Sequence, residues 1–349
     1  MGRIGDAMGK IGYLFKRIKG MNYKGFFDTI NEVHNKSKKN KILLFFDIIH
    51  CGLKYQAGYM DYKLLEMYRI PEKNRNTFIT RGINNEIVTK YNNPEYIKYF
   101  RDKIEFNKKF NKYLNRDWME VTDNNFEEFK QFIKKHKRIV IKPVDESCGK
   151  GIEIIEVDDK NLKKTYDNIL KTNRFLVEEV AEQCKEISAL HPNSINTIRM
   201  VTLNKHLVAA YLRIGTGDNV VDNFNHGGIV VPINIDTGTI DYPAIDKHDH
   251  IYEKHPDTEM SIINFQIPKW NKVKNYVEEC SKTIPEMGYV GWDVCLGKDG
   301  PCLIEGNEFP GHDIYQLPPH RTEDIGMLPL FKKAMEGEMK NENSNSNRS

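Results

Sequence analysis

The sequence of 349 residues lacks any apolar run near the roughly 20 residues that a membrane-spanning helix needs, and it lacks the apolar core of a signal peptide near its start. We therefore expect a cytoplasmic protein. Its six cysteines form no Cys-x-x-Cys pair, which argues against a zinc site or a disulfide framework and favours free thiols. A net charge of only +3, from 52 basic and 49 acidic side chains, gives no overall field that would attract nucleic acid.

The composition, with 39 % hydrophobic and 29 % charged residues, is that of a globular protein of two or three packed units. Apolar spacing divides the chain into four regions. These are a mainly helical N-terminal region (1–100), a region of alternating helix and strand (101–180), a strand-rich region (181–336) and a polar tail that we expect to be disordered (337–349). The first 30 residues are basic and weakly amphipathic, which is compatible with contact to a membrane surface or with a solvated helix packed on the body.

Several local patterns predict individual elements. A helix is expected at 123–135 and another at 271–283, because apolar residues recur there at helical spacing. Residues 197–203 and 207–214 read as two strands of a hairpin that turns at Asn204-Lys205. Further β-branched runs predict strands at 138–142, 152–157, 175–180, 291–296 and 302–305.

Three oxygen-bearing side chains gather on the predicted hairpin near the C-terminus. Asp293 lies on its first strand, and Glu305 and Asn307 lie at the end of its second, two residues apart and therefore on one face. The glycines of the turn at 297–300 fold the strands together. Two carboxylates and an amide oxygen are hard ligands that suit Mg²⁺ carried by nucleotide phosphates. The alternative is a solvated hairpin edge, where acids are common.

A second pattern is a strand that delivers Lys142, followed by a loop of small residues that contains Ser147, Gly149 and Gly151. A lysine can neutralise a phosphate as a point charge, and glycines allow backbone N–H groups to approach phosphate oxygens. The Walker pattern Gly-x-x-x-x-Gly-Lys-Ser/Thr is absent. A plain hairpin turn is the alternative interpretation.

The third pattern is the strand that ends in Glu178, Glu179 and Val180, with Glu186 seven residues after Glu179. Such a strand could offer backbone groups to adenine and a carboxylate to ribose hydroxyls. A strand that simply runs into an acidic loop is the alternative.

The fourth pattern comprises Arg199, Arg213 and the segment NFNHGG at 223–228, which contains Asn225 and His226. Arginines can stabilise the charge of a transferring phosphoryl group, and a glycine pair can present N–H groups to an acyl phosphate. Surface arginines beside an ordinary glycine turn are the alternative.

In this order the four patterns resemble the ATP-grasp superfamily. The spacing of Asp293, Glu305 and Asn307 is similar to that of the D-alanine–D-alanine ligases, although those enzymes carry an arginine where this chain has Gly291. The run Arg101-Asp102-Lys103 resembles the segment that supplies the first ATP lysine in ribosomal-protein glutamate ligases. The stretch LHPNSINTIRMVT at 190–202, with GWDV at 291–294 and IEGN at 304–307, is most similar to the sugar-transfer-associated ATP-grasp family and its teichuronopeptide-type relatives.

This resemblance implies an α+β fold, the ATP-grasp fold, in which two lobes (101–180 and 181–336) clasp ATP. It implies an ATP- and Mg²⁺-dependent ligase that joins a carboxylate to an amine through an acyl phosphate, in cell-surface polysaccharide synthesis. By the same resemblance, Lys103 and Lys142 bind phosphates, Glu186 binds ribose, and Asp293, Glu305 and Asn307 bind the metal. His226 and His312 are candidates for the base that deprotonates the amine.

Two rival functions fit the same motifs. A kinase of this fold would pass phosphate to a hydroxyl or another acceptor, and a non-catalytic scaffold would bind nucleotide without turnover. A nucleic-acid module fits less well, because the basic run at 134–138 reads as a solvated helix end. The acid, the amine and the oligomeric state are not encoded in any pattern that we identify.

Overall fold

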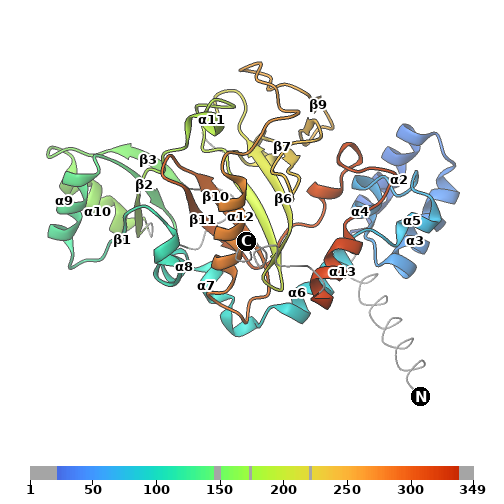
Figure 1. Ribbon diagram of the computed structural model, residues 1–349, viewed down its shortest axis with the longest axis horizontal. Helices are drawn as coiled ribbons and strands as arrows, with labels where there is room; N and C mark the ends of the chain where they lie inside the picture. Colours follow the sequence, from blue (N-terminus) through green and yellow to red (C-terminus); the bar gives the residue numbers. More distant parts are fainter. Residues whose placement is uncertain (1–21, 145–150, 173–174, 220–221, 338–349) are drawn as a thin grey trace, which may run out of the picture. The chain divides into compact units, whose positions relative to one another are not determined.

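The computed structural model describes residues 22–144, 151–172, 175–219 and 222–337 (Figure 1). The chain folds into two compact units. The first comprises the chain up to Ile87 together with Gln316–Pro329, and the second comprises Val88–Tyr315 together with the residues from Leu330 onward. The polar tail predicted at 337–349 lies, from residue 338, outside the described residues.

The first unit is helical. Asn22 and Asn40 cap the two longest helices of its described part by accepting hydrogen bonds from the first-turn N–H groups of Gly25 and Ile42. Its core packs around Tyr62, Tyr68 and neighbouring apolar side chains. The helices of this region are α2 (Tyr23–Ser37), α3 (Lys41–Tyr55), α4 (Tyr59–Leu64), α5 (Glu72–Arg75) and α6 (Arg81–Tyr91), the last of which leads into the second unit.

The C-terminal segment of the first unit is joined to it through Gln316. The side-chain amide of this buried residue donates to the carbonyl of Ile79 and accepts from its N–H, both at 2.9 Å. Gly326 has no room for a side chain, since a Cβ atom there would come within 2.6 Å of the Phe78 backbone. Residues that lie far apart in the sequence therefore build one small core.

The second unit contains a four-stranded antiparallel sheet in the order β1-β4-β2-β3. Helices α9 (Phe126–Lys135) and α10 (Leu162–Lys171) cover one face of it (Figure 1), where Phe129 and Tyr166 pack on Ile139, Ile141 and Val177. The strands are β1 (Trp118–Glu120), β2 (Arg138–Lys142), β3 (Glu153–Glu156) and β4 (Leu176–Glu179).

The second unit also contains a seven-stranded antiparallel sheet in the order β11-β10-β5-β6-β7-β8-β9. Trp292 lies buried in its core against Phe100 and Phe110, and its indole N–H donates to the Thr202 hydroxyl at 2.8 Å. The strands are β5 (Ile198–Leu203), β6 (His206–Ile214), β7 (Ile229–Pro232), β8 (Ala244–Ile245), β9 (Ile251–Tyr252), β10 (Tyr289–Leu296) and β11 (Pro301–Asn307).

Helices complete the second unit. Helix α12 (Trp270–Ser281) packs its apolar side on the seven-stranded sheet through Val273 and Val277. The remaining helices are α7 (Lys98–Arg101), α8 (Lys103–Phe110), α11 (Lys185–Ser188) and α13 (Leu328–Glu336), which begins in the first unit and continues into the second.

Most of the predicted elements are confirmed, with shifted ends. Asn204 and Lys205 have φ values of 51° and 72°, the left-handed pair that a two-residue hairpin turn requires. The helix predicted from residue 123 begins only at Phe126, because Asn125 Oδ1 accepts the Thr122 N–H at 2.9 Å and closes a turn instead. Strand β11 runs two residues beyond the predicted end, as far as Asn307.

Two expectations drawn from composition can be compared with the described part of the chain. Within those ranges Cys51, Cys184, Cys280, Cys295 and Cys302 are free, and all but Cys184 are buried. None of the helices described here combines the length and the apolar character that crossing a bilayer requires.

Candidate functional site

Asp293 lies at the centre of the candidate site. In the strand register it faces Glu305 of β11 on one side and Arg199 of β5 on the other. Its side chain is only 1 % exposed, and both carboxylate oxygens accept from arginines: Oδ2 lies 2.8 Å from Arg199 Nη2 and 3.0 Å from Arg213 Nη2. Burial by itself raises the pKa of Asp293, but the two guanidinium groups outweigh it and lower the pKa to about 2. Asp293 is therefore a carboxylate anion.

The pKa of Glu305 is shifted in the opposite direction to that of Asp293. Burial, followed by the neighbouring negative charge of Asp293 and a hydrogen bond between the two carboxyl groups, raises the pKa of Glu305. The pKa values of the two neighbouring carboxyl groups are thus shifted in opposite directions by their surroundings. The alternative interpretation, a solvated hairpin edge, is wrong for Asp293, which is buried among ion-paired side chains.

Asn307 completes the group of three. It pairs in register with Gly291, and its Nδ2 atom is one of three buried side-chain atoms of the described residues that lack a hydrogen-bond partner. The nitrogen and oxygen of an amide occupy equivalent positions, so a half-turn of the group would place the carbonyl oxygen at this position. An unpartnered amide beside two carboxyl groups fits the donor set that Mg²⁺ prefers.

Arg213 joins Asp293 to a second buried acid, Asp222. Its guanidinium donates to the Thr197 hydroxyl from Nε at 2.9 Å and from Nη2 at 2.7 Å, and Nε lies 3.5 Å from Asp222 Oδ2. Asp222 in turn accepts the Thr197 N–H at 2.7 Å, and burial raises the pKa of Asp222. Since Arg199 and Arg213 are only 11 % and 15 % exposed, the interpretation as surface arginines is wrong.

The segment 223–228 begins immediately after Asp222. Asn223 Oδ1 accepts the Asn225 N–H at 2.9 Å, and Lys247 donates to the Asn225 carbonyl at 3.0 Å. Gly227 has a φ of 98°, and a Cβ atom on Gly228 would lie 2.4 Å from the Asp222 carbonyl oxygen. The loop is therefore closed tightly over Asp222. The side chains of Asn225 and His226 are exposed, whereas His312 is buried.

Lys142 ends β2 in an ion pair with the buried carboxylate of Glu178, whose Oε2 lies 2.5 Å from Nζ. The same carboxylate accepts from Arg116 Nη2 at 3.0 Å and from Asn107 Nδ2 at 2.8 Å. Burial raises the pKa of Glu178, but Arg116 and Lys142 together hold that pKa well below its usual range. Arg116 also donates to the Leu303 carbonyl of β11, so this network ties the four-stranded sheet to the strand that carries Glu305.

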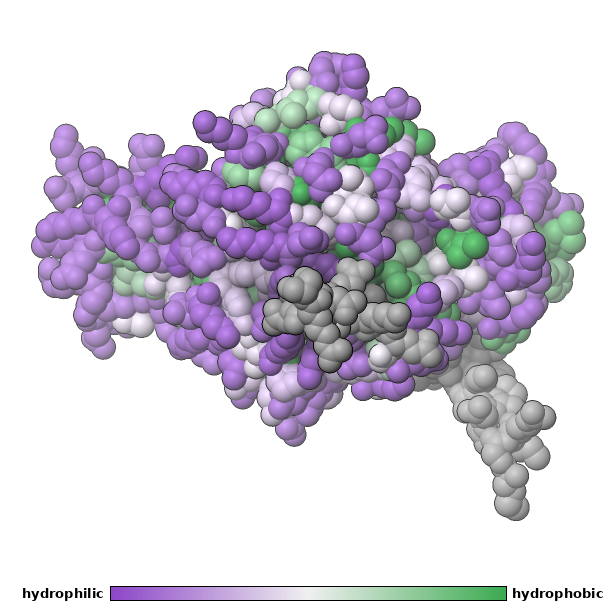
Figure 2. All heavy atoms as spheres, viewed as in Figure 1, coloured by the Kyte–Doolittle hydropathy of each residue, from purple (hydrophilic) through white to green (hydrophobic). Residues whose placement is uncertain are grey.

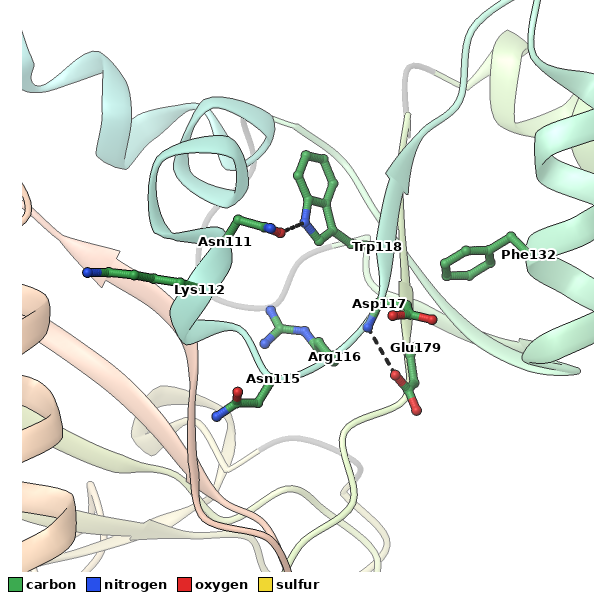
Figure 3. Close-up of a pocket in the computed structure, with 8 residues that line it drawn as sticks. All are labelled: Asn111, Lys112, Asn115, Arg116, Asp117, Trp118, Phe132 and Glu179. Carbon is green, nitrogen blue, oxygen red and sulfur yellow. Dashed lines mark hydrogen bonds between the residues drawn. The ribbon is translucent and has the colours of Figure 1, made fainter.

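Glu179 points to the other face of β4, as alternation along a strand requires. Its Oε2 accepts the Asp117 N–H at 3.0 Å, and it lines an open cavity of about 590 Å³ (Figure 3). In the close-up, Asn111 and Trp118 are joined by a hydrogen bond on one side of this cavity and Phe132 of α9 faces it from the other. The two neighbouring acids of the predicted adenine-binding strand thus have different surroundings.

The other predicted nucleotide-binding residues lie around these strands. Lys103 begins α8, where Asp102 caps the helix, and its N–H donates to the Val144 carbonyl at 3.2 Å next to the end of β2. Val180 follows β4, and Glu186 is exposed on α11. Gly151 has a φ of 69°, in the left-handed region. Ser147 and Gly149 lie outside the described residues.

The stretch 190–202 supports the start of β5, which carries Arg199. Asn196 is fully buried, donates to the Ile187 and His191 carbonyls at 3.1 Å and accepts the Gly215 N–H at 3.2 Å. His255 binds the Gly215 carbonyl at 2.8 Å from the other side. No local motif of the sequence predicts His255, Asp222, Arg116 or Asn107, because each acts through a partner that is distant in sequence.

Comparison with known proteins gives three similar solved structures. The ATP-grasp ligase PsnB bound to a minimal precursor is 13 % identical with a TM-score of 0.42, over 70 % of this chain and 63 % of that one. D-alanine–D-alanine ligase from Bacillus anthracis is 14 % identical with a TM-score of 0.40, over 73 % and 74 %. D-alanyl-alanine synthetase A from Vibrio cholerae is 14 % identical with a TM-score of 0.39, over 70 % and 66 %.

The chain thus spans less than two thirds of the length of PsnB. A search of curated proteins found no match. The pattern of the family described as sugar-transfer associated ATP-grasp matches residues 82–322, which is more than half of the sequence and includes every candidate site residue discussed above. This chain therefore belongs to the sugar-transfer associated ATP-grasp family and has the α+β fold of that group.

Proposed function

We propose that the protein is an ATP- and Mg²⁺-dependent ligase that forms an amide from a carboxylate and an amine. The observation that carries this proposal is the convergence of Asp293, Glu305 and Asn307 on neighbouring strands, with Arg199 and Arg213 in direct contact with Asp293. Membership of the ATP-grasp family supports ATP as the co-substrate. We also propose the domain assignment given by the sequence, with nucleotide-binding lobes at 101–180 and 181–336.

The roles follow from the charges. Lys142 and Lys103 would bind phosphates, the segment 178–180 would contact adenine, and Glu186 would bind ribose. Mg²⁺ held by Asp293, Glu305 and Asn307 would neutralise the β- and γ-phosphates. Arg199 and Arg213, which otherwise neutralise Asp293, would then turn their positive charge to the phosphoryl group in transfer and stabilise it. Asn225 and the glycine pair at 227–228 would bind the activated acid.

The reaction proceeds in two steps. An oxygen of the substrate carboxylate attacks the γ-phosphorus, the bond to the bridging oxygen breaks, and ADP leaves. The amine nitrogen then attacks the carbonyl carbon of the acyl phosphate, and inorganic phosphate leaves as the C–N bond forms. A base takes the proton of the amine. His226, which is exposed beside the glycine pair, and His312, which is buried, are the two candidates.

The family description, sugar-transfer associated, supports substrates from cell-surface polysaccharide synthesis. We propose an amino acid, a uronic acid or another sugar derivative as the pair of substrates. This assignment rests on the family alone, since fold does not identify a substrate.

The test is a mass-spectrometric screen of acid–amine pairs with ATP and Mg²⁺. We expect a condensation product, ADP and phosphate in equal amounts, and release of phosphate that requires both substrates. Asp293→Asn or Glu305→Gln should lower turnover by several orders of magnitude. Glu127→Gln is the matched control, because this acid on α9 is 71 % exposed and lies outside the site. A stable phosphorylated product would replace the ligase with a kinase, and nucleotide binding without turnover would favour the scaffold.

A further inference from the structure

Helix α3 of the first unit has two apolar faces. Leu44, Ile48, Cys51 and Tyr55 point inward and are at most 5 % exposed. The opposite side carries what we call the outer face of α3, formed by Ile42, Phe46, Ile49 and Leu53, which are 66 %, 62 %, 39 % and 56 % exposed. Their spacing of four, three and four residues places all four side chains on one side of the helix.

The outer face continues onto neighbouring side chains. Leu43, beside it on the same helix, is 69 % exposed, and Tyr23 and Phe27 of the adjacent helix α2 are 52 % and 54 % exposed. Figure 2 shows hydrophobic side chains in green at the surface on the right of the view, in the part of the molecule that contains α2 and α3. A helix that is apolar on all sides is normally buried on all sides, and a patch of this kind marks an interaction site.

Lysines outnumber acids on α3 and at its start. Asp47, the single acid of α3, turns inward, where it binds Arg75 at 2.6 Å and the Tyr62 hydroxyl at 2.6 Å. Lys38 and Lys41 lie exposed at the start of the helix. In the sequence as a whole, the first 60 residues hold eleven Lys and Arg against four Asp and Glu, whereas the remaining 289 residues hold an excess of four acids.

We propose that the outer face of α3 docks onto the surface of an anionic phospholipid bilayer. Apolar side chains at helical spacing would enter the boundary between head groups and acyl chains, and exposed lysines such as Lys38 and Lys41 would bind lipid phosphates. The concentration of positive charge in the first 60 residues of a nearly neutral chain favours this partner over a neutral apolar protein surface. The proposal does not depend on the ligase reaction, so that the two can fail separately.

The test is sedimentation of the full chain with lipid vesicles. We expect binding to vesicles that contain phosphatidylglycerol, weaker binding to phosphatidylcholine alone, and release as the salt concentration rises. The triple variant Ile42→Ser, Phe46→Ser, Leu53→Ser should bind at least about tenfold more weakly, because it removes apolar area that would enter the membrane. These side chains are exposed, so the variant should keep the urea unfolding midpoint of the parent.

Two substitutions serve as matched controls. Ile325→Ser in the first unit and Ile251→Ser in the second remove isoleucines that are 45 % and 57 % exposed on other elements, and vesicle binding should not change. The proposal fails if the parent chain remains in the supernatant with anionic vesicles, or if the triple variant binds them as well as the parent. It also fails if sedimentation equilibrium shows a dimer that the triple variant dissociates while neither protein binds vesicles.

Discussion

Asp222 shows how a residue without a motif can belong to the candidate site. It lies behind Arg213, contacts Thr197 twice and closes the loop that leads to Asn225. Its carboxylate contacts Arg213, which in turn contacts Asp293. Asp222 is not predicted from the sequence, because an isolated aspartate before a polar loop has no distinguishing pattern.

We expect Asp222→Ala to lower turnover at saturating ATP by about tenfold, because Arg213 would lose one of the partners that orient it toward the phosphoryl group. Asp222→Asn should retain more activity, since an amide oxygen can still accept the Thr197 N–H. Phosphate release under matched conditions measures both variants. Equal activity of Asp222→Ala and the parent would remove Asp222 from the site.

Glu178 is a buried carboxylate whose negative charge is balanced by Arg116 and Lys142. Glu178→Ala should lower the free energy of unfolding by about 3–5 kcal/mol, because it leaves Arg116 and Lys142 buried without their anion. Urea denaturation of the variant and of Glu127→Gln, which alters an exposed pair, provides the measurement. Because the pKa of Glu178 is depressed in the folded state, its contribution is present above the unfolded pKa near 4.5 and declines as pH falls below it.

His255 affects stability in the same direction as Glu178, but at a higher pH. Burial lowers its pKa below the usual 6.5, so that the unfolded chain takes up a proton at a pH where the folded chain does not. The unfolded state is then favoured as pH falls through 6.5, and the free energy of unfolding should decrease between pH 7 and pH 5. Urea titrations of the parent and of His255→Gln at several pH values should show a smaller decrease in the variant. Identical pH dependence of the two proteins would contradict this account.

At the scale of elements, the hairpin of β10 and β11 depends on close packing on the face opposite Glu305 and Asn307. A Cβ atom on Gly306 would lie 2.8 Å from Phe100 Cδ1 and 2.9 Å from Phe106 Cε2. Glycine between Glu305 and Asn307 therefore allows β11 to approach the aromatic side chains of α7 and α8, and this approach positions both candidate ligands.

Gly306→Ala should displace β11 and lower the free energy of unfolding by about 1–3 kcal/mol, the usual cost of overpacking. Turnover should fall further than stability alone explains, because both neighbouring ligands move with the strand. Gly311→Ala is the control, since a Cβ atom there would be no nearer than 3.5 Å to its first neighbour, Asp313 Oδ1. Thermal unfolding and phosphate release of the two variants should separate the effects, and similar behaviour of both would argue against close packing as the cause.

At the scale of the whole molecule, the second unit joins its two sheets through side-chain hydrogen bonds, among them those of Arg116 with Leu303 and of Asn115 with Pro301. A nucleotide bound between the sheets would add contacts to both. Binding to the folded state alone stabilises a protein by about 2.7 kcal/mol when the ligand is present at 100 times its Kd.

We therefore expect ADP with Mg²⁺ to raise the Tm of the full chain by on the order of 5 °C at such concentrations. Lys142→Ala should lose most of this increase, because it removes a phosphate contact, whereas Glu127→Gln should keep it. Differential scanning fluorimetry with and without nucleotide supplies the measurement. The nucleotide assignment is wrong if ADP leaves the Tm of the parent unchanged at millimolar concentration.

The sequence by itself determined the features that depend on neighbours along the chain. The left-handed turn at Asn204-Lys205, the alternation that separates Glu178 from Glu179 and the pairing of Asp293 with Glu305 all follow from local backbone geometry. Only the tertiary structure decided which charges meet. Arg116 reaches Glu178, 62 positions away, and Arg199 reaches Asp293, 94 positions away. An unpaired charge costs free energy once the fold buries it, so buried charges are found in pairs. The spacing of residues along the chain does not indicate which charges the fold will bury together.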